Sequence, residues 1–267
     1  MATKNATRLG LTPVNGQSGF TLIELSIVIM IMGLVLGGLA VPLAAQRENA
    51  RLRDADAQLE MLSTALTGYA LVNGSLPCPA SPGSNGSSDT AGGACSLQHG
   101  FVPATTLGLS GNRNDDNLLL DPWGGALRYS VSNADVDTDG LWDFTTPGEL
   151  RDVGIAQLLP DLAVCSTATG ASGNACGSAA TTLTSQAPAV VYSLGKDWPD
   201  FSSPDQVENV GGSVSGGPSG SSYRIATNSV FVARGKSEIA GSEFDDIVTW
   251  LSPVSLYQGL VTAGQLP

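Results

Sequence analysis

One carboxylate stands inside a long apolar run near the amino terminus. The run Phe20–Ala45 contains a single charge, that of Glu24. A charged side chain at the centre of a bilayer costs about 2.5–3.5 kcal/mol on insertion scales. A carboxylate in such a setting is stabilised by pairing with a cation. We therefore expect Glu24 to have a partner or a function.

A second group of carboxylates has the spacing of a metal-binding loop. The segment DVDTDGLWD supplies four acidic side chains: Asp135, Asp137, Asp139 and Asp143. Calcium takes six to eight oxygen ligands, and Gly140 would give the sharp bend that such a loop needs. An EF-hand would require glutamate at the twelfth position, where Thr146 stands, and Glu149 falls three residues later. The pattern favours a single-loop calcium site over an EF-hand, and the alternative is a solvated acidic turn.

Catalytic and nucleic-acid-binding patterns are absent from the sequence. The chain has one histidine, His99, as the base of any Ser–His–Asp set, and it has no GxSxG, no P-loop and no GxGxxG that opens a helix. The formal net charge is −12, and without Lys4 and Arg8 the remaining Lys and Arg against Asp and Glu give 10 − 24 = −14. This acidic balance argues against nucleic-acid binding through the body of the protein. We expect no enzymatic activity.

The four cysteines form two spaced pairs: Cys78, Cys95, Cys165 and Cys176. There is no CxxC and only one histidine, so a zinc site lacks ligands. Disulfides in an oxidising compartment are the better interpretation. Three pairings are open, and Cys78–Cys95 with Cys165–Cys176 is favoured because each bridge closes a short segment.

A long helix must carry Glu24. The pattern predicts one helix from Phe20 to about Gly68, with the apolar half (20–45) long enough to cross a bilayer. Lys4 and Arg8 precede it, which places the amino terminus in the cytoplasm. Gly33 and Gly37 form a GxxxG that favours close helix contact, and these glycines together with Pro42 weaken the middle of the helix.

The second half of this helix (46–68) is amphipathic. Its apolar stripe recurs at spacings of three and four: Leu52, Ala55, Leu59, Leu62, Leu66 and Tyr69. Gly68 and the pair Asn73-Gly74 provide stop signals. The stripe predicts packing of this half on a globular body, residues 69–267.

The rest of the chain favours strands and loops. Strands are predicted over four segments: 126–131, 189–194, 229–232 and 247–250. Strands separated by long loops after one long helix predict an α+β class, with an antiparallel sheet packed on the helix.

The segment GFTLIEL, Gly19 to Leu25, resembles the processing site of type IV prepilins and type II secretion pseudopilins. The resemblance implies a pilin fold, a leader of residues 1–19 that prepilin peptidase removes between Gly19 and Phe20, and N-methylation of Phe20. It also implies that the new amine of an incoming subunit pairs with Glu24 of its neighbour. The implied partners are other pilin-like subunits, the peptidase, the inner-membrane assembly platform and the membrane.

The same resemblance implies a location and leaves several roles open. The chain would be a single-pass inner-membrane protein with a periplasmic globular domain, and later part of a periplasmic or cell-surface filament. The alternatives are a low-copy tip subunit that acts as a binding module or initiates assembly, and a membrane-anchored enzyme. In the family a tip subunit can lack the glutamate, so Glu24 favours a position in the shaft.

Three further segments resemble the major pseudopilin: DPWGGALRYSVS (121–132), VYSLGKD (191–197) and FDDIVTW (244–250). In that relative a loop between such segments binds calcium. The resemblance implies these ligands: the Leu194 carbonyl, Asp197, Asp245 and Asp246. The loop is far longer in this chain, which is a departure from the family pattern. No cofactor is required by the interpretation, and calcium is the one candidate.

Overall fold

The computed structural model describes residues 19–198 and 200–266, and for residues 38–43 it describes the backbone alone. Residues 1–18 of the predicted leader lie outside the described residues. The chain divides into two compact units, Met1–Asn49 and Ala50–Pro267. Helix α1 (Leu22–Asn73) contributes its first half to one unit and its second half to the other.

Helix α1 ends at the second of its two predicted stop signals. Gly68 remains helical, since one glycine inside a helix costs only about 1 kcal/mol relative to alanine. Gly74 takes a φ of +69°, and its N–H donates to the Ala70 carbonyl at 2.8 Å. This left-handed cap satisfies a terminal carbonyl and ends the helix at Asn73. The predicted end near Gly68 is therefore too early.

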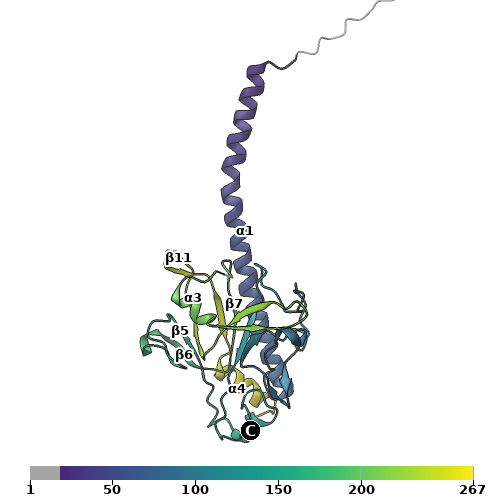
Figure 1. Cartoon of the computed structure of the whole chain (residues 1–267), viewed down its shortest axis with the longest axis vertical. Helices are drawn as coiled ribbons and strands as arrows, with labels where there is room; N and C mark the ends of the chain where they lie inside the picture. Colours follow the sequence, from purple (N-terminus) through teal and green to yellow (C-terminus); the bar gives the residue numbers. More distant parts are fainter. Residues whose placement is uncertain (1–18, 199, 267) are drawn as a thin grey trace, which may run out of the picture. The chain divides into compact units, whose positions relative to one another are not determined.

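The second half of α1 buries one stripe of side chains: Ala55, Leu59, Leu62, Leu66 and Ala70. The central positions of the predicted stripe are confirmed. Tyr69 is only half-buried, and Ala70 takes its place because it lies one turn beyond Leu66. Figure 1 shows the strands of the second unit gathered around this half of the helix.

A four-stranded antiparallel sheet packs on that stripe. Its order is β13 (Ile247–Trp250), β7 (Ala189–Ser193), β4 (Arg128–Val131) and β3 (His99–Phe101). Tyr129 pairs with Val191, and both join the core that contains Leu62 and Leu66. Val190 and Tyr192 point to the opposite face, into a second core with Phe231. The α+β class is confirmed for this unit.

A three-stranded sheet lies next to the second core. Its order is β10 (Val230–Val232), β5 (Leu162–Cys165) and β6 (Thr182–Ala187). β6 is antiparallel to β5, whereas β10 runs parallel to it. The strand predicted at 229–232 therefore forms, but the expectation of antiparallel pairing is wrong for it. The long connection between β5 and β10 makes a parallel pair accessible.

The DPWG turn holds β4 against β7. Asp121 Oδ1 accepts hydrogen bonds from the N–H groups of Trp123 at 2.9 Å and Gly125 at 2.8 Å. Asp121 Oδ2 accepts from the Ser193 hydroxyl of β7 at 2.6 Å. Gly124 has a φ of +89°, which only glycine adopts without strain. The aspartate thus ties the turn to the neighbouring strand.

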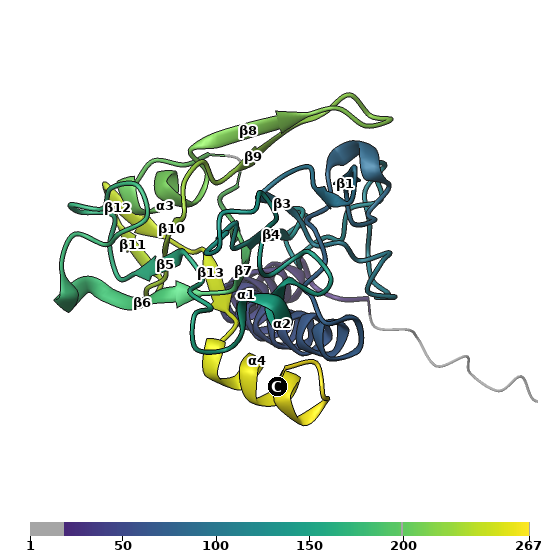
Figure 2. The same cartoon turned by 90° about the horizontal axis from the view of Figure 1, so that it is seen from below.

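Short elements complete the second unit. They are η1 (Pro82–Ser84), β1 (Thr90–Ala91), β2 (Ala94–Cys95), α2 (Glu149–Val153), η2 (Ala179–Thr181), α3 (Pro204–Asn209), β8 (Gly212–Ser215), β9 (Ser222–Ile225), β11 (Ser237–Ile239), β12 (Ser242–Phe244) and α4 (Pro253–Thr262). Figure 2 shows α4 beside α1. A Cβ on Gly259 of α4 would lie 2.9 Å from Leu71 Cδ2, so glycine permits this close approach.

Candidate functional site

Glu24 takes part in a reciprocal set of hydrogen bonds at the start of α1. The Glu24 N–H donates to the Thr21 hydroxyl at 3.3 Å, and Glu24 Oε2 accepts from the Thr21 N–H at 3.2 Å and hydroxyl at 3.1 Å. This arrangement is a capping box with Thr21 at the N-cap. The sequence analysis missed this role, although Thr-x-x-Glu before an apolar run is its signature. The capping box fixes the Glu24 carboxylate at the amino-terminal end of α1.

The Glu24 carboxylate is also open to other molecules. Its side chain is exposed, and all three hydrogen bonds to Thr21 leave Oε1 unused. Within the described part of the chain, no group donates to Oε1. An external cation could therefore approach Glu24 without breaking the capping box.

The first half of α1 exposes apolar side chains on every side. Leu22 is 88% exposed, Met30 70% and Leu34 73%. Exposed apolar residues also occupy consecutive positions: Ile27, Val28, Ile29, Met30, Ile31 and Met32. Successive helix positions lie about 100° apart, so these side chains surround the axis. An apolar surface this continuous indicates a site of contact with protein or lipid.

Among the described residues, we find no helix that combines the length and the apolar character needed for a membrane span.

Packing against the described residues does not require the glycines of the predicted GxxxG. A Cβ on Gly33 or Gly37 would meet nothing within 4 Å. Both glycines thus leave a low surface that another helix could approach. Pro42 lies within the backbone of α1, and its side chain is outside the described residues.

The acidic loop between β4 and α2 gathers its carboxylates into two overlapping groups. Oxygens of Asp135, Asp137 and Asp143 lie within 4.8 Å of one another, as do oxygens of Asp137, Asp139 and Glu149. Backbone bonds shape the loop, with Asp135 accepting from the N–H groups of Asp139 at 3.1 Å and Gly140 at 2.9 Å. All four predicted aspartates therefore come together.

Glu149 joins this loop although its sequence position disfavoured it. It is the first residue of α2 and is only 7% exposed. Counted along the sequence from Asp135, Glu149 stands three residues beyond the twelfth position, where an EF-hand has its glutamate. The signal that could have found it is the acidic residue after Pro147-Gly148, where a turn leads into a short helix.

The two buried acids of the loop have raised pKa values. Burial, with the nearby charges of Asp137 and Asp135, raises the pKa of Asp143 to about 6, and the hydrogen bond from the Val136 N–H opposes this rise only in part. Burial and the charges of Asp139 and Asp137 also raise the pKa of Glu149. Like charges held close together disfavour one another's ionised forms.

The second candidate calcium site is the set of ligands that the resemblance implies, and a side-chain amide joins two of them. The Gln206 amide of α3 donates to Asp197 Oδ2 at 2.9 Å and to Asp245 Oδ1 at 3.2 Å. Asp245 Oδ2 also accepts from the Lys196 N–H at 2.6 Å. A side-chain amide from the longer loop thus stands between two of the predicted ligands.

The remaining two members of that set are buried. Leu194 is fully buried, and Asp246 Oδ2 accepts from the Asn209 amide at 2.7 Å. Burial raises the pKa of Asp246 to about 8 and, with the neighbouring Asp197, that of Asp245 to about 7. In the described residues these side chains form no group with metal-ligand spacing. Calcium binding here stays a prediction.

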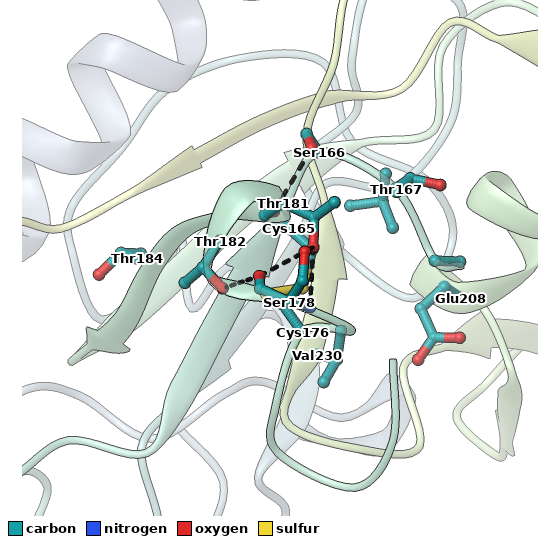
Figure 3. Close-up of a disulfide and its surroundings, with 12 residues drawn as sticks. Cys165, Ser166, Thr167, Cys176, Ser178, Thr181, Thr182, Thr184, Glu208 and Val230 are labelled. Atoms are coloured by element: carbon teal, nitrogen blue, oxygen red, sulfur yellow. Dashed lines mark hydrogen bonds between the residues drawn. A yellow bond between two sulfur atoms is a disulfide. The ribbon is translucent and has the colours of Figure 1, made fainter. Parts of the chain in front are cut away.

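Two disulfides have the connectivity that the short loops favoured. Cys78 is bonded to Cys95 of β2, and Cys165 of β5 is bonded to Cys176. Figure 3 shows hydrogen-bonded Ser178, Thr181 and Thr182 beside the second bridge, where the Thr182 hydroxyl donates to the Ser178 carbonyl at 2.8 Å. Each bridge fastens a loop to the body of the second unit.

His99 lies inside the protein. It is 8% exposed, its Nδ1 lies 3.0 Å from the Ser130 hydroxyl, and Nε2 has no hydrogen-bond partner in the described residues. Burial lowers the pKa of His99 to about 4. A general base works best with a pKa near the operating pH and within reach of its substrate. This environment suits a packed structural histidine.

Comparisons with known proteins bear on the amino-terminal segment. Residues 14–40 match the family model of the prokaryotic N-terminal methylation motif. No curated protein and no solved structure matches the chain. The matched residues include Gly19, Phe20 and Glu24. The match supports the resemblance of this amino-terminal segment to those of type IV pilins and pseudopilins.

Proposed function

We propose that this chain is a structural subunit of a type IV filament, either a pilus or a type II secretion pseudopilus. The observation that carries the proposal is the exposed apolar surface around the first half of α1, in a segment that matches the methylation motif. Packing such helices together would remove this surface from water, at roughly 25 cal/mol per Å². The second half of α1 would join the filament core to the globular body through the pilin fold.

Processing would prepare the subunit for assembly. Prepilin peptidase would cut between Gly19 and Phe20, and the new amine of Phe20 would be methylated. Phe20 is 86% exposed and precedes the first residue of α1, which supports access by a peptidase. Before assembly, the segment Phe20–Ala45 would anchor the chain in the inner membrane with its globular body in the periplasm. The assembly platform would then transfer it to other pilin-like subunits.

Glu24 would guide each incoming subunit. The mature Phe20 carries an ammonium group, and the free Oε1 of a neighbour's Glu24 offers the opposite charge. Inside a bundle of apolar helices, pairing offsets much of the desolvation penalty that either charge would bear alone. The capping box lowers the entropy cost of pairing because it already orders the carboxylate. The presence of Glu24 supports a position of this subunit in the filament shaft rather than at its tip.

The proposed role is not enzymatic. The single histidine is buried, hydrogen-bonded to Ser130 and low in pKa, which supports a structural task for it.

Two substitutions in the native cell test this function. Gly19→Ala should leave an uncut precursor in the membrane, since the peptidase requires glycine before the cleavage site. Glu24→Val should be processed normally, but the yield of filaments should fall about tenfold or more, as the loss of about 1.4 kcal/mol per contact implies. Glu60→Val, a change at an exposed glutamate of the same helix, is the matched control. Normal filament yield from Glu24→Val would contradict the charge-pairing mechanism.

A further inference from the structure

One carboxylate grouped with the acidic loop, that of Glu149, has a buried and unpaired oxygen. Glu149 is only 7% exposed, and its Oε2 is shielded from solvent with no hydrogen-bond partner among the described residues. Leaving a buried charge unpaired is costly, so such a group indicates a missing partner. Because a Glu149 oxygen lies within 4.8 Å of oxygens of Asp137 and Asp139, that partner would sit among these carboxylates.

Among the residues that the structure describes, no Lys or Arg forms an ion pair with this loop. The described ion pairs join Arg234 with Asp205 and Lys236 with Glu238, and neither involves the loop. Arg151 lies close in sequence, yet it donates to the carbonyls of Gly264 and Gln265. The negative charges of the loop are therefore balanced by solvent ions or by a bound cation.

The spacing of the oxygens fits a calcium ion. Calcium–oxygen distances are about 2.3–2.6 Å, so two ligands on opposite sides of one ion are about 5 Å apart. The limit of 4.8 Å among the oxygens of Asp137, Asp139 and Glu149 falls within that span. Ligands that are all oxygen favour a hard cation, and the flexible coordination of calcium suits a loop better than the strict octahedron of magnesium.

Backbone hydrogen bonds do not use up these ligands. Asp139 Oδ1 accepts from the Leu141 N–H at 2.8 Å, which leaves its other oxygen for a cation. Asp143 accepts only long bonds of 3.3 and 3.4 Å from the Val136 N–H. A solvated turn would explain Asp137 and Asp139, which are exposed, but it does not explain why Glu149 is buried beside them.

We propose that the loop binds one calcium ion through Asp137, Asp139 and Glu149, with Asp135 and Asp143 adding negative charge beside it. The ion would join the exposed loop to the first turn of α2, whose Leu150 lies in the core that α1 and the sheet share. Calcium would thereby stabilise the globular unit. This site is separate from the set around Asp245 and does not depend on filament assembly.

Thermal unfolding of the full chain in detergent tests the site. After chelation, calcium at a hundredfold excess over Kd should raise the Tm of the wild type by about 5–10 °C, and magnesium should raise it less. In Glu149→Gln the calcium shift should disappear. Without calcium, that variant should unfold at a higher temperature than the wild type, because it lacks the buried unpaired charge.

Matched variants locate the ion. Glu60→Gln, at an exposed position of α1, and Asp245→Asn, in the other acidic set, should both keep the calcium shift. The proposal is overturned if the wild type does not respond to millimolar calcium, or if magnesium acts equally. It is also overturned if the shift survives in Glu149→Gln or is lost in Asp245→Asn.

Terbium luminescence supplies a second readout that does not depend on Glu149 variants. Terbium replaces calcium and emits when a nearby tryptophan is excited, and Trp142 lies next to Asp143 in the loop. Sensitised emission should fall in Trp142→Phe and persist in Trp198→Phe, since Trp198 adjoins Asp197 in the other set. The opposite pattern would contradict the proposed location.

Discussion

The buried His99 should determine part of the stability loss in mildly acidic solution. Its pKa falls from the ordinary value of 6.5 in the unfolded chain to about 4 in the folded protein. As the pH drops below 6.5, the unfolded state binds the proton first, so the folded state loses stability until the pH reaches about 4. The stability that neutral His99 contributes is therefore fully present above pH 6.5, its pKa in the unfolded chain.

The size of this effect follows from the two pKa values. The full difference corresponds to about 3 kcal/mol in the free energy of unfolding, and about 2 kcal/mol of it should be lost between pH 7 and pH 5. Asp143, Asp245 and Asp246 have raised pKa values and change stability in the opposite direction over part of this range. Their effect must be removed by comparison with a variant.

His99→Asn is the suitable comparison because asparagine does not titrate and can still bond to Ser130. Urea unfolding of the full chain at pH 7 and pH 5 should show a loss about 2 kcal/mol larger for the wild type than for the variant. The effect of the aspartates is common to both proteins and cancels in this difference. Equal losses would refute the assignment of His99 as a neutral buried side chain, and a catalytic base would again need consideration.

Three further predictions concern the core, the second disulfide and the helix surface. Leu62→Ala should cost about 2–5 kcal/mol of unfolding free energy, while Met61→Ala, an exposed neighbour, should change it by less than about 0.5 kcal/mol; equal effects in urea titrations would contradict the buried stripe. Replacing Cys165 and Cys176 together by serine should cost about 3 kcal/mol, since the bridge spans 11 positions, and an unchanged unfolding midpoint would argue against this bridge. Gly33→Leu should lower filament yield without changing the Tm of the globular unit, because a Cβ there meets nothing within 4 Å among the residues that the structure describes.

Local patterns predicted much of the fold. The stripe from Ala55 to Leu66 has helical spacing, and the segments at 126–131, 189–194 and 247–250 alternate or carry β-branched residues, so helix and strands were readable from the sequence. The pairing of β10 with β5 was not readable, because nothing local in Val230–Val232 specifies a parallel partner far away in the chain. Long-range contacts of this kind are determined by the packing of the whole unit.

In the candidate sites, too, features with a local sequence signature were predictable and features that depend on distant contacts were not. The capping role of Glu24 has a local signature in Thr21-x-x-Glu24, whereas its proposed filament partner belongs to another molecule and leaves no trace in a single chain. The aspartates of the acidic loop were predictable from alternate spacing. For Glu149 the turn at Pro147-Gly148 is only a partial signal, since its approach to the aspartates depends on how the loop turns back at Gly148, whose φ is 103°.

The most direct test of filament assembly is the amino-terminal peptide of the subunit. Filaments sheared from native cells, or the envelope fraction if the filament stays inside it, would be digested and analysed by mass spectrometry. The proposed function predicts a peptide that begins with N-methylated Phe20. A mature chain that begins after Ala45, or one that retains the leader at Met1, would contradict it.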